Sequence, residues 1–72
     1  MAYTELLPLP ENDEVLIRSK DLPKYLPVAY QTLVRWRHEL KGPNYIKLGG
    51  HTVAYKAGDV RKWIAHQSRE HL

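Results

Sequence analysis

The pair Gly49-Gly50 constrains the fold of this 72-residue chain more than any other feature, because it separates two runs of alternating character. Large apolar residues alternate with others in residues 45–48 and again in residues 52–56. A period of two is typical of half-buried strands, and two adjacent glycines can both adopt the positive φ angles that tight hairpin turns require. The sequence therefore predicts a two-stranded β-hairpin with His51 and Thr52 at its tip.

Three short helices are predicted around this hairpin. Ser19 as an N-cap, with Asp21 in the first turn, predicts a first helix that Pro27 ends after about two turns. A second helical pattern covers about residues 30–40 and stops at Gly42 and Pro43, and a third covers about residues 57–67. The residues expected to face inward are Leu22, Tyr25 and Leu26 in the first helix, Leu33, Trp36 and Leu40 in the second, and Val60, Trp63 and Ile64 in the third. The predicted fold class is α+β.

Charge is distributed unevenly along the chain. Residues 1–17 contain four acidic residues and no Lys or Arg, whereas residues 18–72 contain 11 basic residues against four acidic ones, a balance of 11 − 4 = +7. Such an excess favours a nucleic-acid partner, because neutralising phosphates releases condensed counterions. With Pro8 and Pro10 in the acidic part, we expect residues 1–14 to form an extended acidic arm, residues 15–67 a basic domain and residues 68–72 a frayed end.

Length and composition argue against most enzyme classes. A chain of this size has one small core, and the sequence contains no nucleophile with a plausible partner base, no glycine-rich phosphate loop and no acidic pair in a predicted cleft. We therefore expect no catalytic residue and no cofactor. Without cysteine, and with no two histidines at helical spacing, we expect no metal site. No segment resembles a signal peptide or membrane span, and the absence of cysteine favours a reducing, cytoplasmic location, in association with the nucleoid.

The second predicted helix carries the most informative surface. Opposite its apolar side lie polar residues that include Gln31 and Arg35, in the half of the helix that follows a tight turn. Gln can pair with adenine and Arg with guanine in the major groove, the geometry in which helix-turn-helix proteins place their recognition helix. The alternative is that these residues form an ordinary solvated helix face.

Three segments of the chain form a distinctive set: Thr-Leu-Val-Arg-Trp-Arg at 32–37, Gly-Pro-Asn-Tyr-Ile-Lys-Leu-Gly-Gly at 42–50 and Asp-Val-Arg-Lys-Trp-Ile at 59–64. In their order and approximate spacing they resemble the excisionase/AlpA family of small, MerR-like winged helix-turn-helix proteins, within a match over about residues 16–66. The chain departs from the family at 26–29, where Leu-Pro-Val-Ala replaces Leu-Gly-Val-Ser, and after Gly50, where the family has a more basic wing. Because of the first departure, the resemblance does not determine the geometry of the turn. The second implies that the wing binds phosphate more weakly than in the family.

The resemblance implies a winged helix-turn-helix fold and binding to double-stranded DNA, with the second helix in the major groove and the wing at the minor groove or its phosphates. By position, the implied DNA-binding residues are Tyr30, Gln31, Thr32, Arg35, Arg37 and His38 on the recognition helix, and Lys47, His51, Thr52 and Lys56 on the wing. Among these, Tyr30, Gln31 and Arg35 are expected to read bases, and Thr32 and Arg37 to contact phosphates. Arg37 and Lys56 could instead serve only to balance charge.

Members of this family act on phage or mobile-element DNA as excision factors, which bend the attachment region, or as transcriptional regulators. The sequence does not separate these two roles, and the implied partners besides DNA are an integrase or neighbouring copies of the chain. The alternative function is a protein-docking module that binds an integrase or polymerase subunit through its basic face. For the acidic arm, two possibilities stay open: a solvated tail, or a segment that covers the basic face and weakens non-specific binding.

Overall fold

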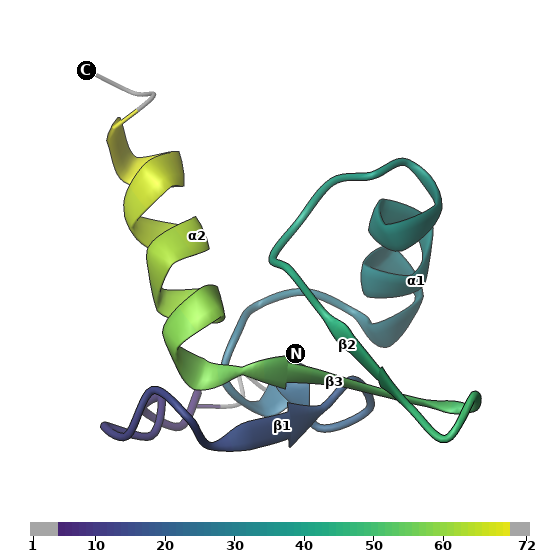
Figure 1. Ribbon diagram of the computed structural model, residues 1–72. Helices are drawn as coiled ribbons and strands as arrows, with labels where there is room; N and C mark the ends of the chain where they lie inside the picture. Colours follow the sequence, from purple (N-terminus) through teal and green to yellow (C-terminus); the bar gives the residue numbers. More distant parts are fainter. Residues whose placement is uncertain (1–4, 70–72) are drawn as a thin grey trace.

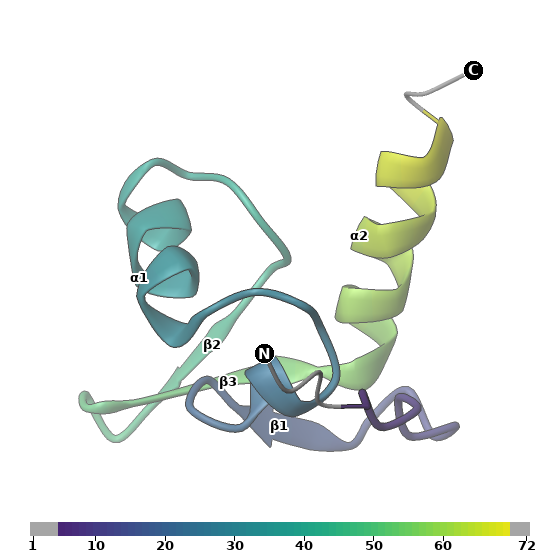
Figure 2. The same cartoon turned by 180° about the vertical axis from the view of Figure 1, so that it is seen from behind.

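A three-stranded antiparallel sheet, two α-helices and a 3-10 turn make up the computed structural model, which describes residues 5–69. In chain order, the elements are β1 (Leu16–Arg18), the 3-10 turn (Leu22–Lys24), α1 (Tyr30–His38), β2 (Ile46–Leu48), β3 (Thr52–Lys56) and α2 (Ala57–Arg69). Both helices stand on the same side of the sheet, α1 towards the hairpin turn and α2 at the opposite end of β3 (Figures 1 and 2). The predicted α+β class is confirmed.

The sheet confirms the predicted hairpin and adds a strand that the sequence analysis missed. Strands β2 and β3 pair around Gly49 and Gly50, whose φ angles are +63° and +86°. The strand order is β1-β3-β2, so β3 is central, and β1 pairs with it in the register Ile17 to Tyr55. The prediction treated residues 15–17 only as an apolar run before a helix, because their pairing partner lies far along the chain.

The predicted first helix is wrong. Ser19 caps no helix, because its backbone N–H donates to the Val53 carbonyl at 2.8 Å and so extends the pairing of β1 with β3. The chain then forms a 3-10 turn over Leu22–Lys24, in place of the expected two turns of α-helix. Pro23 has no N–H to donate, and Pro27 disfavours the helical conformation at the residue before it, so a regular α-helix is not sustained.

Helix α1 begins at Tyr30 as predicted but ends at His38, two residues earlier than expected. Its end is a Schellman motif: Leu40 has a φ of +59°, Lys41 N–H donates to the Trp36 carbonyl at 2.7 Å, and Leu40 N–H donates to the Arg37 carbonyl at 3.3 Å. The left-handed conformation turns the chain outward. Leu40, predicted to face the core, is therefore 91% exposed.

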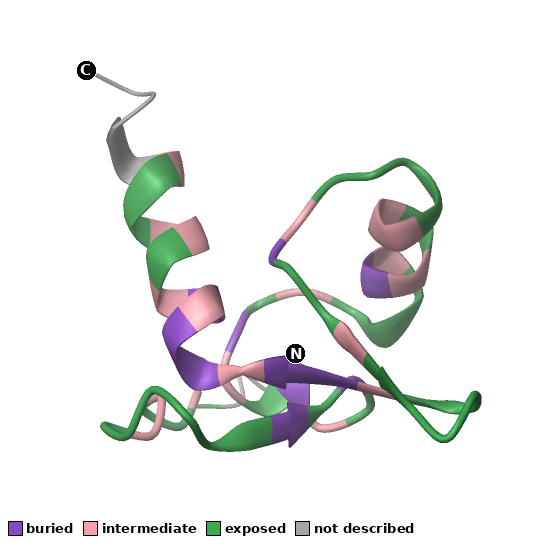
Figure 3. Cartoon of the chain, viewed as in Figure 1, coloured by how far each residue is buried: buried purple, intermediate pink, exposed green. Residues whose placement is uncertain are grey.

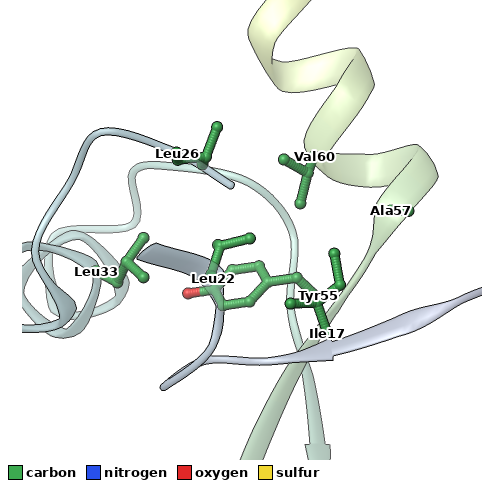
Figure 4. Close-up of a cluster of buried hydrophobic side chains, with 7 residues drawn as sticks. All are labelled: Ile17, Leu22, Leu26, Leu33, Tyr55, Ala57 and Val60. Atoms are coloured by element: carbon green, nitrogen blue, oxygen red, sulfur yellow. The ribbon is translucent and has the colours of Figure 1, made fainter. Parts of the chain in front are cut away.

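The core lies between the sheet and the two helices and receives side chains from nearly every element (Figures 3 and 4). Figure 4 shows the Tyr55 ring at the centre of the cluster with its oxygen directed towards the side of Leu33. The buried cluster consists of Ile17, Leu22, Leu26, Leu33, Tyr55, Ala57 and Val60. Trp36 and Trp63 are half-buried beside it, with ring centroids 5.3 Å apart, so they connect α1 to α2 as packing residues.

The acidic residues before β1 pack against the start of α2. This helix follows β3 without a connecting loop, and its first two N–H groups donate to backbone carbonyls: Ala57 to Val15 at 2.9 Å and Gly58 to Asp13 at 3.1 Å. The Arg61 guanidinium donates to the Asp13 carboxylate and to the Pro10 carbonyl. This part of the predicted arm therefore contacts α2. Helix α2 continues to Arg69, and residues 70–72 of the predicted frayed end lie outside the described residues.

Candidate nucleic-acid interface

A polar strip runs along the solvent-facing side of α1. Ala29 precedes the helix in an extended conformation, and its carbonyl accepts from the N–H groups of Thr32 and Leu33, which fixes where the helix starts. Leu33 then anchors the opposite side in the core. The strip consists of Gln31, Arg35 and His38, all exposed and spaced by four and three residues, so they lie on one face. The predicted site residue Thr32 is half-buried at the edge of this face.

Next to this strip, a hollow of about 300 Å³ opens between α1, the end of β1 and the β2–β3 hairpin. We call it the basic hollow. Its lining residues are Arg18, Ser19, Lys20, Tyr30, Arg37, His51, Thr52 and Val53. Four predicted site residues, Tyr30, Arg37, His51 and Thr52, are thus brought together from two separate elements. No carboxylate of the described residues lines the basic hollow.

Hydrogen bonds to buried side chains hold the guanidinium of Arg37 at the edge of the domain. Its Nη1 donates to the Ser19 hydroxyl and to the Tyr55 hydroxyl, both at 2.9 Å, and its Cζ lies 5.7 Å from the centroid of the Tyr45 ring. Ser19 and Tyr55 are almost fully buried. Arg37 therefore links α1 to β3 and to the end of β1, a structural role that the sequence did not indicate.

The two lysines predicted for the wing lie in different surroundings. Lys47 is exposed on β2 opposite Val53, at the hairpin end of the sheet. Lys56 lies at the other end of β3, four residues from Thr52 and so about 13 Å away at the usual rise of a strand. Its ammonium pairs with the Glu14 carboxylate at 3.3 Å. Lys47 is therefore near the basic hollow, whereas Lys56 is not.

Cations are paired on one part of the surface and unpaired on another. Within residues 5–69, the ion pairs with carboxylates are Lys24 with Asp21, Lys41 with Glu39, Lys56 with Glu14 and Arg61 with Asp13. The described cations without such a pair are Arg18, Lys20, Arg35, Arg37, Lys47 and Lys62. All of these except Lys62 of α2 lie on α1, on the hairpin or at the end of β1. The polar strip and the basic hollow thus form one surface whose cations have no carboxylate partner in the part of the chain that the structure describes.

Arg18 and Lys20 belong to this surface, yet the sequence analysis did not select them. The predicted helix began at Ser19, between these two residues, so neither was expected to lie beside a sheet strand. The available signal was the basic pair that flanks Ser19 directly after the apolar run at residues 15–17, a pattern that also fits the end of a strand.

The described part of the chain contains no helix long and apolar enough to cross a membrane. Nor do three His, Asp or Glu side chains within residues 5–69 come together as a metal site would require. Comparisons of the chain with family models, with curated proteins and with solved structures find no match. Support for a function therefore comes from the geometry and charge of this surface and from the motifs of the sequence.

Proposed function

We propose that this chain is a sequence-specific, double-stranded DNA-binding protein of the winged helix-turn-helix type. In this proposal α1 enters the major groove, the β2–β3 hairpin is the wing, and the 3-10 turn takes the place of the first helix of the motif. The observation that carries the proposal is the surface formed by α1, the hairpin and the end of β1, whose cations have no carboxylate partner among the described residues although most cations elsewhere do. Such a surface suits a polyanion.

The dimensions and chemistry of α1 support the same proposal. A helix with its side chains is about 10–12 Å across and the major groove is about 12 Å wide, so α1, whose nine residues extend over about 14 Å, fits into the groove. Its exposed strip presents Gln31 and Arg35, the side-chain types that pair with adenine and guanine edges. Gln31 and Arg35 are the base-reading residues in this proposal, and the basic hollow beside them faces the DNA backbone.

The resemblance to the excisionase/AlpA family extends the proposal to a biological role. A chain that binds DNA without catalysis acts by occupying a site and by bending it, with added contacts that offset the elastic cost of the bend. That mode of action serves both an excision factor, which helps an integrase to assemble on an attachment region, and a transcriptional regulator. Several adjacent sites beside an attachment region would indicate excision, and a single promoter site would indicate regulation.

The test is selection of bound sequences from a random double-stranded DNA pool, repeated with Gln31→Ala and Arg35→Ala. We expect the unmodified protein to select a defined motif and each variant to lose preference at one or two positions, with about 1–3 kcal/mol lost for each base contact. Lys62→Ala is the matched control, because it also removes an exposed cation without a carboxylate partner among the described residues, but from α2. The control should select the unchanged motif.

A folded protein that selects no motif would contradict the proposal. In that outcome the surface would fit the alternative function, docking of an acidic protein partner, because a protein-docking face has no reason to discriminate between bases. Circular dichroism of every variant separates loss of recognition from loss of folding.

A further inference from the structure

The position of Arg37 at the basic hollow leaves one side of its guanidinium open. Nη1 donates to the hydroxyls of Ser19 and Tyr55, so two of its five N–H groups point into the domain. The groups on Nε and Nη2 have no acceptor among residues 5–69. Arg37 also lines the hollow, so these three N–H groups remain for a bound anion.

Three contacts hold the guanidinium in this orientation. Ser19 is 4% exposed and is fixed by its own backbone bond to Val53, while Tyr55 is 1% exposed at the centre of the core. The Tyr45 ring lies against the guanidinium as a cation–π partner. An arginine held in this way loses little side-chain entropy when it binds, and its planar edge matches two oxygens of one phosphate.

The remaining lining of the basic hollow favours an anion. Arg18 and Lys20 stand at its β1 side, both exposed and both without a carboxylate partner among the described residues. His51 and Thr52 bring further polar groups from the hairpin. With about 300 Å³, the hollow has room for one phosphate group.

We propose that the basic hollow binds one backbone phosphate of double-stranded DNA, held by the open edge of Arg37 together with Arg18 and Lys20. Ser19 and Tyr55 are positioning residues in this site, since they orient Arg37 and do not touch the phosphate. The inference rests on the proposed function and deepens it: the site lies between the helix and the hairpin, so it sets the register of α1 on the DNA backbone. An acidic protein surface fits less well, because its carboxylates lie on separate side chains and are not regularly spaced as the phosphates of DNA are.

The experiment uses the selected duplex with a single neutral methylphosphonate, moved one position at a time along each strand. For the unmodified protein we expect one backbone position at which the neutral group lowers affinity about tenfold to a hundredfold, the usual effect of losing a charge-assisted hydrogen bond. Arg18→Ala and Lys20→Ala change exposed side chains. In these variants the methylphosphonate at this position should lower affinity less than it does for the unmodified protein, while its effect at other positions should stay the same. Lys62→Ala should show the full pattern.

Two further variants test the positioning residues. Tyr55→Phe and Ser19→Ala each remove one hydroxyl that orients Arg37 and leave its charge in place. In both variants the methylphosphonate at the same backbone position should lower affinity less than it does for the unmodified protein. If the two hydroxyls had only a structural role, the variants would bind more weakly but would keep the same dependence on methylphosphonate position. Arg37→Lys keeps the charge but cannot form the two-pronged contact, so it should resemble Tyr55→Phe.

The outcomes separate this site from the proposed function. If the unmodified protein selects a motif but every variant shows the same methylphosphonate pattern, the phosphate site is wrong and the DNA-binding function stands. If Lys62→Ala reduces the loss of affinity caused by the methylphosphonate as much as Arg18→Ala does, the reduction reflects the overall charge of the protein, and the phosphate site is again wrong. If the unmodified protein binds no DNA, both proposals fail.

Discussion

At the scale of single residues, Leu40 shows how a helix end can impose an unfavourable conformation. Its φ of +59° places a β-carbon where only glycine is free of strain, and its side chain gains no burial in return. The conformation exists because the Schellman motif satisfies two carbonyls at the end of α1 and redirects the chain towards β2. Gly42 follows with a φ of +83°, where a β-carbon would lie 2.9 Å from Trp36 Cε3.

We therefore expect Leu40→Gly to stabilise the protein. Glycine removes a left-handed strain of about 1–2 kcal/mol but adds freedom to the unfolded chain, which leaves a net gain of about 0.5–1 kcal/mol. For a domain of this size the gain raises Tm by about 2–8 °C. Thermal unfolding followed by circular dichroism measures it. Leu40→Ala is the control, since it removes the exposed side chain but keeps the β-carbon, and an equal gain in that variant would show that strain is not the cause.

At the scale of elements, the start of α2 depends on the acidic segment that precedes β1. Among the described residues, no side chain caps this end in the way that Ser or Asp caps other helices; the carbonyls of Val15 and Asp13 accept its first N–H groups instead. The close approach is possible because residue 58 is glycine. A β-carbon there would lie 2.6 Å from Asp13 Cβ.

Gly58→Ala should consequently destabilise the protein, although alanine is favoured over glycine within helices by about 0.8–1.0 kcal/mol. The clash with Asp13 must displace the segment and break its bonds to α2, and we expect a net loss of about 1–3 kcal/mol. Urea unfolding measures this loss. The substitution Asp13→Gly removes both clashing side-chain atoms. Gly58→Ala should therefore lower the free energy of unfolding less when it is made in the Asp13→Gly variant than when it is made in the unmodified protein. The same loss in both backgrounds would disprove the contact.

The elements that the sequence predicted are those with local signals. Helix α1, the β2–β3 hairpin and α2 each have a clear period or a glycine turn, and each is present within a few residues of its predicted bounds. Strand β1 and the 3-10 turn were missed, because a distant partner, and not the local pattern, determines that Ser19 continues a strand pairing. This error had a direct consequence for the site. Gln31 and Arg35 were placed correctly on the exposed face, whereas Arg18 and Lys20 were not considered.

At the scale of the whole molecule, one core joins β1, the 3-10 turn, β3 and both helices. The 3-10 turn contributes Leu22, which is fully buried, and the strands and helices contribute the rest of the cluster around Tyr55 (Figure 4). A core of this size supplies only about 3–5 kcal/mol of net stability. A single cooperative unfolding transition is the expected behaviour.

Leu22→Ala should therefore remove half or more of the stability of the protein. Truncation of a buried leucine costs about 2–5 kcal/mol, because apolar contact is lost and a cavity remains. Leu16→Ala provides the matched control, since Leu16 is 46% exposed on β1 and should lose well under half as much. Urea unfolding followed by tryptophan fluorescence and by circular dichroism measures both losses. Similar losses for the two variants would contradict the assignment of Leu22 to the core.

The pairing of β1 with β3 also determines when this protein can fold during its synthesis. Leu16 lies opposite Lys56, so the first strand is translated well before its partner. Until then the nascent chain exposes apolar residues that later become buried, a state that is prone to aggregation. Folding must therefore follow the emergence of β3, and translation from the N-terminus gives no stable early intermediate. A chain rearranged so that β1 follows β3 closely would fold faster while keeping the same sheet.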